Sequence, residues 1–307
     1  MDAVLGPAEP GDLGARLHEL TRETHETTMA TLTLELASGR PDFRHAREGS
    51  VWTDVEGRVC GRSYIGRDRR WLDWFETGVL GFTDRSPRVH VWPASGVSLD
   101  DVQAEFERML RSIVLQAQGW QALHAGAALT PDGAVLFSGP AGSGKSTTAY
   151  AFGQIGWRHL ADDQVVWRLD RGRARMLELP FTPALPPLSQ VHLAGPAAPL
   201  RHAGGDALIP VVAIYLLHQR TGRDRPAAIS RVPPARAFSQ LLPYAHCFDV
   251  KVEATRSFTG DYLTLAHDVP VFTLSYSPDL ERLPELMHAI VSSAAAPTLD
   301  AAPVGVA

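Results

Sequence analysis

The sequence contains few cysteines and very few lysines. Cys60 and Cys247 are the two cysteines among 307 residues, and no C-x-x-C pair is present. This excludes a disulfide framework and the usual ligand spacing of a zinc site, and it favours a reducing cytoplasm. Lysine plus arginine number 29, yet Lys145 and Lys251 are the only lysines. A lysine kept by a chain that otherwise uses arginine is a candidate for a specific role.

Three further absences narrow the class of protein. The net charge is −5 and the pI about 6.2, so no basic field favours nucleic acid as a partner. The first residues lack a basic start followed by an apolar run, so we expect no signal peptide. The longest apolar stretch, IPVVAIYLL, is far too short to span a membrane. With 45% hydrophobic and 21% charged residues, the composition predicts a soluble, cytoplasmic globular protein without a membrane partner.

The hydrophobic patterns divide the chain into four parts. Residues 1–97 carry short alternating stretches such as TLTLEL and RVHVW, separated by Gly and Pro, which predict a β-rich region. WLDWF, within this region, fits a helical turn or a strand. Ser98 and Asp101 form an S-x-x-D capping box that opens a linking helix over 98–119. An α/β domain is expected over 120–295, and an Ala- and Pro-rich flexible tail over 296–307.

The α/β domain begins with two predicted buried strands. LHAGAAL and GAVLFSG are joined by the turn residues TPDG, and a helix from Lys145 to about 154 follows. The strand WRHLADD and a hairpin over QVVWRLD and RARMLEL come next, then a strand in IPVVAIYLL, a helix in ARAFSQLL, a strand in VPVFTLSY and a closing helix. Residues 180–199 hold six prolines and cannot form a regular element. They are either a lid or substrate loop, or a passive connection.

Gly139 to Ser146, with the sequence GPAGSGKS, matches the phosphate-binding pattern G-x-x-x-x-G-K-[ST]. Glycines let the backbone wrap closely around phosphates, and the lysine reaches the terminal phosphates. The serine hydroxyl binds Mg²⁺, and the amino end of the following helix favours negative charge. An apolar strand precedes the motif and a helix follows it, as this site requires. The predicted nucleotide-binding residues are Gly139, Pro140, Ala141, Gly142, Ser143, Gly144, Lys145, Ser146 and Thr147.

Two adjacent aspartates, Asp162 and Asp163, follow the strand that comes after this helix. In isolation the pair is typical of a β-turn. Downstream of a phosphate loop, the end of such a strand brings carboxylates near the terminal phosphate. One carboxylate can then hold Mg²⁺ and the other can take the proton of an attacking hydroxyl.

The order H-A-x-A-A, then G-K-S, then L-A-D-D-x-V resembles the catalytic domain of the HPr serine kinase family. The resemblance covers about residues 120–295 and is strongest over 123–166. It implies a phosphate-loop kinase domain of the HPr kinase and PEP carboxykinase type. It further implies that His124 and Lys145 act in catalysis, that Asp162 is the base, and that Asp163 and Ser146 lie at the metal. PPARAF resembles a further family segment, which would make Arg236 a phosphate-facing catalytic residue.

Two departures separate the chain from that family. Thr147 stands where the family often has glutamate, and the proline-rich segment PFTPALPPLSQV replaces a glycine-rich signature. The likeness is therefore better to HPr-kinase-like enzymes outside sugar regulation, such as those that modify lasso-peptide precursors. The expected function is ATP- and Mg²⁺-dependent phosphorylation of an aliphatic hydroxyl, most simply a serine of a peptide or protein.

Two other functions remain open at this point. The same site could phosphorylate a small hydroxyl compound, or the protein could be a nucleotide-gated peptide-binding module with little turnover. A homo-oligomer is compatible with the sequence. Five arginines, Arg58, Arg62, Arg67, Arg69 and Arg70, gather in the N-terminal region. They fit a solvated face, or a surface on which an acidic peptide docks.

Overall fold

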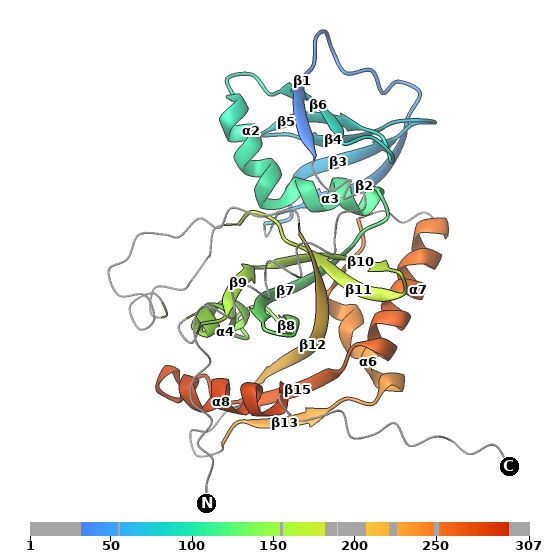
Figure 1. Cartoon of the computed structure of the whole chain (residues 1–307). Helices are drawn as coiled ribbons and strands as arrows, with labels where there is room; N and C mark the ends of the chain where they lie inside the picture. Colours follow the sequence, from blue (N-terminus) through green and yellow to red (C-terminus); the bar gives the residue numbers. More distant parts are fainter. Residues whose placement is uncertain are drawn as a thin grey trace, which may run out of the picture.

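The computed structural model of the protein describes residues 32–54, 56–153, 156–181, 189, 207–220, 226–248 and 252–294. They form a mixed α/β structure with two sheets, the smaller one above the larger in Figure 1. The expected tail at 296–307 and most of the proline-rich segment 180–199 lie outside the described residues. Within the described part, no helix is long and apolar enough to cross a membrane.

The smaller sheet has six strands in the order β1-β6-β5-β4-β3-β2. β1 pairs in parallel with β6, and the other neighbours are antiparallel. WLDWF lies almost wholly in a strand, β4, so the helical alternative for it is wrong. The strands are β1 (Thr33–Leu36), β2 (Arg47–Thr53), β3 (Val59–Ile65), β4 (Arg70–Trp74), β5 (Gly78–Phe82) and β6 (Arg88–Pro93).

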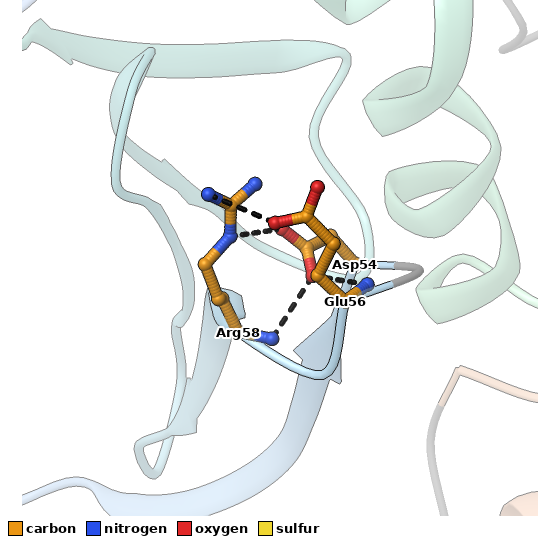
Figure 2. Close-up of polar contacts among 3 residues, drawn as sticks. All are labelled: Asp54, Glu56 and Arg58. Carbon is orange, nitrogen blue, oxygen red and sulfur yellow. Dashed lines mark hydrogen bonds and ion pairs between the residues drawn. The ribbon is translucent and has the colours of Figure 1, made fainter.

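Three of the five clustered arginines in the N-terminal region, Arg58, Arg62 and Arg70, pair with carboxylates. In the β2–β3 turn, Asp54 accepts from the backbone N–H of Arg58 and of Glu56, and its other oxygen lies 2.7 Å from Arg58 Nε (Figure 2). Arg62 pairs with Glu48 at 3.0 Å, and Arg70 pairs with Asp84 at 2.7 Å. Exposed pairs of this kind contribute little stability, but they offset the positive charge locally. This favours the solvated face over an anion-docking surface.

A broken helix packs on the smaller sheet. It consists of α2 (Leu99–Glu105), the π-helical turn η1 (Phe106–Leu110) and α3 (Arg111–Ala117). The capping box is confirmed: Ser98 accepts from the Asp101 N–H, and Asp101 accepts from the Ser98 N–H. Gly119, with φ +91°, follows the end of the helix in a conformation that favours glycine. The apolar face of this helix packs on the sheet at Val102, Phe106, Met109, Leu110 and Ile113, while Leu99 is exposed.

The larger sheet runs in the order β11-β10-β7-β8-β12-β15-β13, and β9 and β14 both pair with β7. The predicted strands and hairpin are present. The strands are β7 (Gln121–Thr130), β8 (Gly133–Ser138), β9 (Arg158–Ala161), β10 (Gln164–Asp170), β11 (Arg173–Leu177), β12 (Leu208–Gln219), β13 (Ala228–Arg231), β14 (Ala245–His246) and β15 (Val271–Tyr276).

Helices cover both faces of this sheet, which makes three layers (Figure 1). α4 (Lys145–Gly153) and α8 (Leu283–Ala294), preceded by the turn η3 (Leu280–Arg282), bury Phe152 and Ile290 against one face. α6 (Pro234–Leu241), followed by the turn η2 (Leu242–Tyr244), and α7 (Val252–Asp268) bury Leu241 and Tyr262 against the other. Because both faces are covered, every residue of β8 is buried.

Three central strands of the larger sheet are parallel. β12 pairs in parallel with β8 on one side and with β15 on the other. Their carboxyl ends therefore meet at one edge, where Ser138 lies beside Leu216, and Gln219 beside Tyr276. In open α/β sheets the crevice at this edge is the usual ligand site. The phosphate-loop motif leaves β8 at this same edge.

Candidate active site

The motif GPAGSGKS forms a tight loop between β8 and the start of α4. Gly139 has φ +156°, and a Cβ there would lie 2.9 Å from the Leu217 carbonyl oxygen. Gly144 has φ +86°, and its Cβ would lie 2.5 Å from the Tyr276 hydroxyl oxygen. Both positions combine a left-handed backbone with close neighbours, so only glycine fits them. The loop thus brings its backbone to the amino end of α4, where unpaired N–H groups favour an anion.

Lys145, the first residue of α4, folds its side chain back over the loop. Its Nζ donates to the carbonyl oxygens of Gly139 at 3.1 Å and of Pro140 at 3.0 Å. Burial lowers the pKa of Lys145, and the nearby carboxylates of Asp163 and Asp162 oppose that shift. An ammonium held above a glycine loop and flanked by carboxylates is placed to meet an anionic group entering from the cavity.

The hydroxyl residues of the loop fit a phosphate and metal site. Among the described residues, the Ser143 hydroxyl is buried and has no hydrogen-bond partner. A buried polar group in that state favours a ligand that can bond with it. Thr147 is buried, and its hydroxyl lies 3.1 Å from that of Ser189. Ser146 lies in the cavity wall, where its hydroxyl could serve a cation with phosphate ligands.

Asp163 adopts a left-handed conformation, with φ +74°, in the short turn between β9 and β10. Its carbonyl oxygen accepts from the Ala125 N–H at 3.2 Å, and its carboxylate lies 3.1 Å from Nδ1 of His124. Nδ1 is also 3.0 Å from the Asp163 carbonyl oxygen. Since both of these oxygens are acceptors, Nδ1 carries the hydrogen. This bond from His124 lowers the pKa of Asp163 despite partial desolvation, so the carboxylate is ionised at neutral pH.

Asp162 differs from Asp163 in its surroundings. It is half-buried, and its carboxylate helps to keep Lys145 protonated. Asp163 has an exposed side chain and lines the cavity, whereas Asp162 is absent from the cavity wall drawn from the described residues. The two aspartates therefore point to different environments, although they are adjacent in sequence.

A cavity of about 450 Å³ joins the phosphate loop to the beginning of α8. One side carries His124, Asp163 and the loop, and the other is formed by the segment that follows β15. The parallel strands explain this arrangement, because β8, β12 and β15 all end here. The wall contains His124, Ala141, Gly142, Gly144, Lys145, Ser146, Thr147, Thr148, Asp163, Ser189, Gln219, Ala227, Tyr276, Ser277, Pro278, Asp279, Leu280, Arg282, Leu283, Glu285 and Leu286.

Several residues of this site are missing from the sequence-based prediction. Gln219 donates through Nε2 to the Gly142 carbonyl oxygen at 3.0 Å. The Tyr276 hydroxyl donates to the backbone carbonyl oxygen of Ser143. Arg282 lines the cavity and pairs with Glu285 at 2.8 Å. Gln219 and Tyr276 end predicted strands, so the rule that ligands bind at the carboxyl edge of parallel strands could have found them.

A second histidine lies beside His124. The rings of His246, on β14, and His124 are 5.8 Å apart and meet edge to face. Burial lowers the pKa of His246, and the neighbouring His124 adds to this, while Asp163 opposes it. Arg108, on η1, is bonded to Glu105, which raises the pKa of Arg108, and the Asp163 carboxylate raises it further. The turn η1 therefore lies within the field of the Asp163 carboxylate.

Arg236 is not brought to the cavity. It is exposed on α6, whose buried residues Ala237 and Leu241 pack toward α7 and the sheet, and it is absent from the cavity wall as described. This helix turns its apolar side inward and leaves Arg236 exposed, and the phosphate-facing role of Arg236 stays a prediction. The predicted lid over 180–199 falls mainly outside the described residues and stays a prediction.

Comparisons with known proteins find similarity among solved structures and none in sequence. No family model matches the sequence, and no curated protein matches it. Among solved structures, the chain is similar to the HPr(Ser) kinase/phosphatase from Coxiella burnetii, with a TM-score of 0.31 and 14% sequence identity. The alignment covers 56% of this chain and 95% of that one.

Proposed function

We propose that this protein is an ATP- and Mg²⁺-dependent kinase that transfers the γ-phosphate to an aliphatic hydroxyl, a serine of a peptide or protein. One observation carries the proposal. Lys145, at the end of the glycine loop where α4 begins, and Asp163, bonded to His124, line the same cavity. An anion-binding loop beside an ionised carboxylate is the arrangement that phosphoryl transfer to a hydroxyl requires.

The loop residues have the binding role in this proposal. The N–H groups of Gly139 and of residues 141–147 and the Lys145 ammonium bind the phosphates, and the buried Ser143 hydroxyl gains a partner there. Ser146 holds the metal together with phosphate oxygens, and bound Mg²⁺ supplies neutralisation of the charge on the phosphates. This fits a wall with few protein ligands: the described residues contain no cluster of three or more His, Cys, Asp or Glu that could hold a metal by itself.

Asp163 has the role of base in this proposal. The sequence assigned the base to Asp162 and the metal to Asp163, but Asp163 is the member of the pair that lines the cavity and contacts His124. Its lowered pKa makes it a weak base, so its contribution lies in orienting the hydroxyl and accepting its proton as the bond to phosphorus forms. Asp162, through its field, keeps Lys145 charged.

In this proposal, the nucleoside of ATP binds the apolar part of the cavity. Ala227, Pro278, Leu280, Leu283 and Leu286 line the side formed by β15 and the start of α8. An apolar slot next to an anion-binding loop matches the two chemical ends of a nucleotide. His124 and Asp163 lie on the opposite side, which leaves that side for the acceptor.

The test is a transfer assay with matched acceptors. The protein is incubated with Mg·ATP and either a set of serine-containing peptides or a set of hydroxyl metabolites, and ADP release and the mass of each product are recorded. The expected result is a gain of one phosphate on a peptide, absent with Lys145→Ala. Transfer to metabolites alone would replace the acceptor class by small molecules. Nucleotide binding without transfer to either set would instead indicate a nucleotide-gated binding module.

A further inference from the structure

The segment 245–248 lies between the two sheets and touches both. β14 pairs antiparallel with β7, with His246 opposite Ala122, two residues from His124. From the smaller sheet, the Ser50 hydroxyl donates to the Phe248 carbonyl oxygen at 2.7 Å. The Phe248 ring packs against the hydrophobic core beneath that sheet. The segment therefore connects the N-terminal region to the strand that carries His124.

The side chain of Gln116, on α3, forms hydrogen bonds with the backbone of this segment at two residues. Its Nε2 donates to the His246 carbonyl oxygen at 2.7 Å, and its Oε1 accepts from the Phe248 N–H. The primary amide thus pairs with two backbone groups two residues apart, as a neighbouring strand would. Both bonding directions of the amide are used, so its orientation is fixed as well.

The rings then lead to the site. His246 stacks on Phe248 at 5.5 Å and meets His124 edge to face at 5.8 Å. His124 donates to the Asp163 carboxylate. These contacts form an unbroken series from α3, in the linking helix, to the carboxylate in the cavity.

We propose that Gln116 is a positioning residue, which holds His246 against His124 and thereby sets the orientation of the His124–Asp163 pair. The linking helix, which packs on the smaller sheet, would then control catalysis through one amide side chain. The kinetic part of this inference depends on the proposed function; the structural part does not. A shift of about 1 Å in a group that orients the reacting atoms can reduce the rate by about a hundredfold.

The chain offers a matched control for Gln116. Gln118 lies two residues further on, and its Nε2 donates to the Ser86 carbonyl oxygen at 2.8 Å, within the N-terminal region and away from β14. Gln116→Met and Gln118→Met each keep side-chain length and remove polar bonds. Gln116→Glu retains an acceptor for Phe248 and loses the donor to His246, so it separates the two ends of the bridge.

The experiment measures transfer rate, Mg·ATP affinity, melting temperature and the ring NMR signals of His124 and His246 in the full chain. We expect Gln116→Met and Gln116→Glu to lower kcat by about ten- to a hundredfold, with unchanged Mg·ATP affinity and shifted signals of both histidines. Gln118→Met should lower the melting temperature to a similar extent and change neither kcat nor these signals.

Two results would overturn the inference. The first is a Gln116→Met protein whose His124 signals and kcat match those of the parent. The second is an equal loss of kcat in Gln118→Met, which would indicate a general structural effect. If the parent protein transfers no phosphate, the proposed function fails, and the His124 signals alone then decide whether Gln116 positions that ring.

Discussion

Tyr276 donates its hydroxyl hydrogen to the carbonyl oxygen of Ser143, which ties the carboxyl end of β15 to the middle of the phosphate loop. The Tyr276 side chain is buried, and burial raises its pKa, so the phenol stays protonated and remains a donor. The same hydroxyl fills the space that a side chain at Gly144 would need. The loop is therefore shaped by its own glycines and by a residue 133 positions away in sequence.

Tyr276→Phe should weaken Mg·ATP binding by about fivefold, because one buried hydrogen bond contributes about 1 kcal/mol. The control is Tyr215→Phe. Tyr215 is also buried, and its hydroxyl lies 2.7 Å from that of Ser293, on α8 and away from the loop. Calorimetric titration with Mg·ATP and thermal melting distinguish the two variants. Equal effects of both on nucleotide affinity would mean that Tyr276 does not shape the loop.

Lys145→Ala should reduce Mg·ATP affinity or turnover by orders of magnitude and leave the fold intact. The Lys145 ammonium donates to two carbonyl oxygens of the loop, and the side chain lines the cavity. Its removal should therefore leave the hydrophobic core intact. Lys251→Ala removes the other lysine of the chain and serves as the control for charge. Circular dichroism and nucleotide titration measure the outcome. An unchanged affinity in Lys145→Ala would refute the phosphate-loop assignment.

Local patterns in the sequence predict most of the larger sheet. The confirmed elements include β7, β8, α4, the β10–β11 hairpin and the capped start of α2. Each has its own turn or cap residues, so its local sequence is enough to predict it. α7 was missed, although Tyr262, Leu265, Ala266 and Val269 repeat at helical spacing and are buried. The polar residues between them, and Gly260 two positions before Tyr262, conceal that pattern.

The sequence predicts the site most directly where its residues are contiguous. The phosphate loop and the Asp pair are continuous motifs, so the sequence places them correctly beside β8 and β9. Gln219, Tyr276 and His246 come from three distant strands, and only the strand order brings them to the loop and to His124. The proposed division of roles between Asp162 and Asp163 depends on the left-handed turn at Asp163, which no local pattern specifies.

His124→Phe should raise the pKa of Asp163. The bond from His124 is the largest cause of the lowered value, and desolvation, which acts in the opposite direction, would remain. The carboxylate would then protonate at higher pH, so the acid limb of the pH–rate profile should shift to higher pH. In the parent protein, the lowered pKa of Asp163 stabilises the fold above the unfolded pKa, and this stability is lost as pH falls through the folded pKa. His124→Phe should reduce that contribution.

Carbon-13 NMR of the carboxyl groups measures that pKa directly. The control is His267→Phe, which removes a histidine 2.7 Å from Asp268 on the exposed end of α7. It should leave the Asp163 titration unchanged. An Asp163 titration that is the same in His124→Phe and in the parent would show that the observed contact does not influence the carboxylate.

Asp163→Asn should abolish most transfer and leave nucleotide affinity near that of the parent. Asparagine has nearly the same size and also tolerates the left-handed backbone at this position, but it cannot accept the proton. A positioned base typically contributes about 10²–10⁴-fold, so a loss of this order is expected, without rescue by added Mg²⁺. Asp162→Asn should mainly weaken nucleotide binding, because it removes a charge that keeps Lys145 protonated. Both variants are titrated with Mg²⁺ at saturating ATP and acceptor. Loss of transfer in Asp162→Asn, together with Mg²⁺ rescue of Asp163→Asn, would reverse the two roles and restore the assignment made from the sequence.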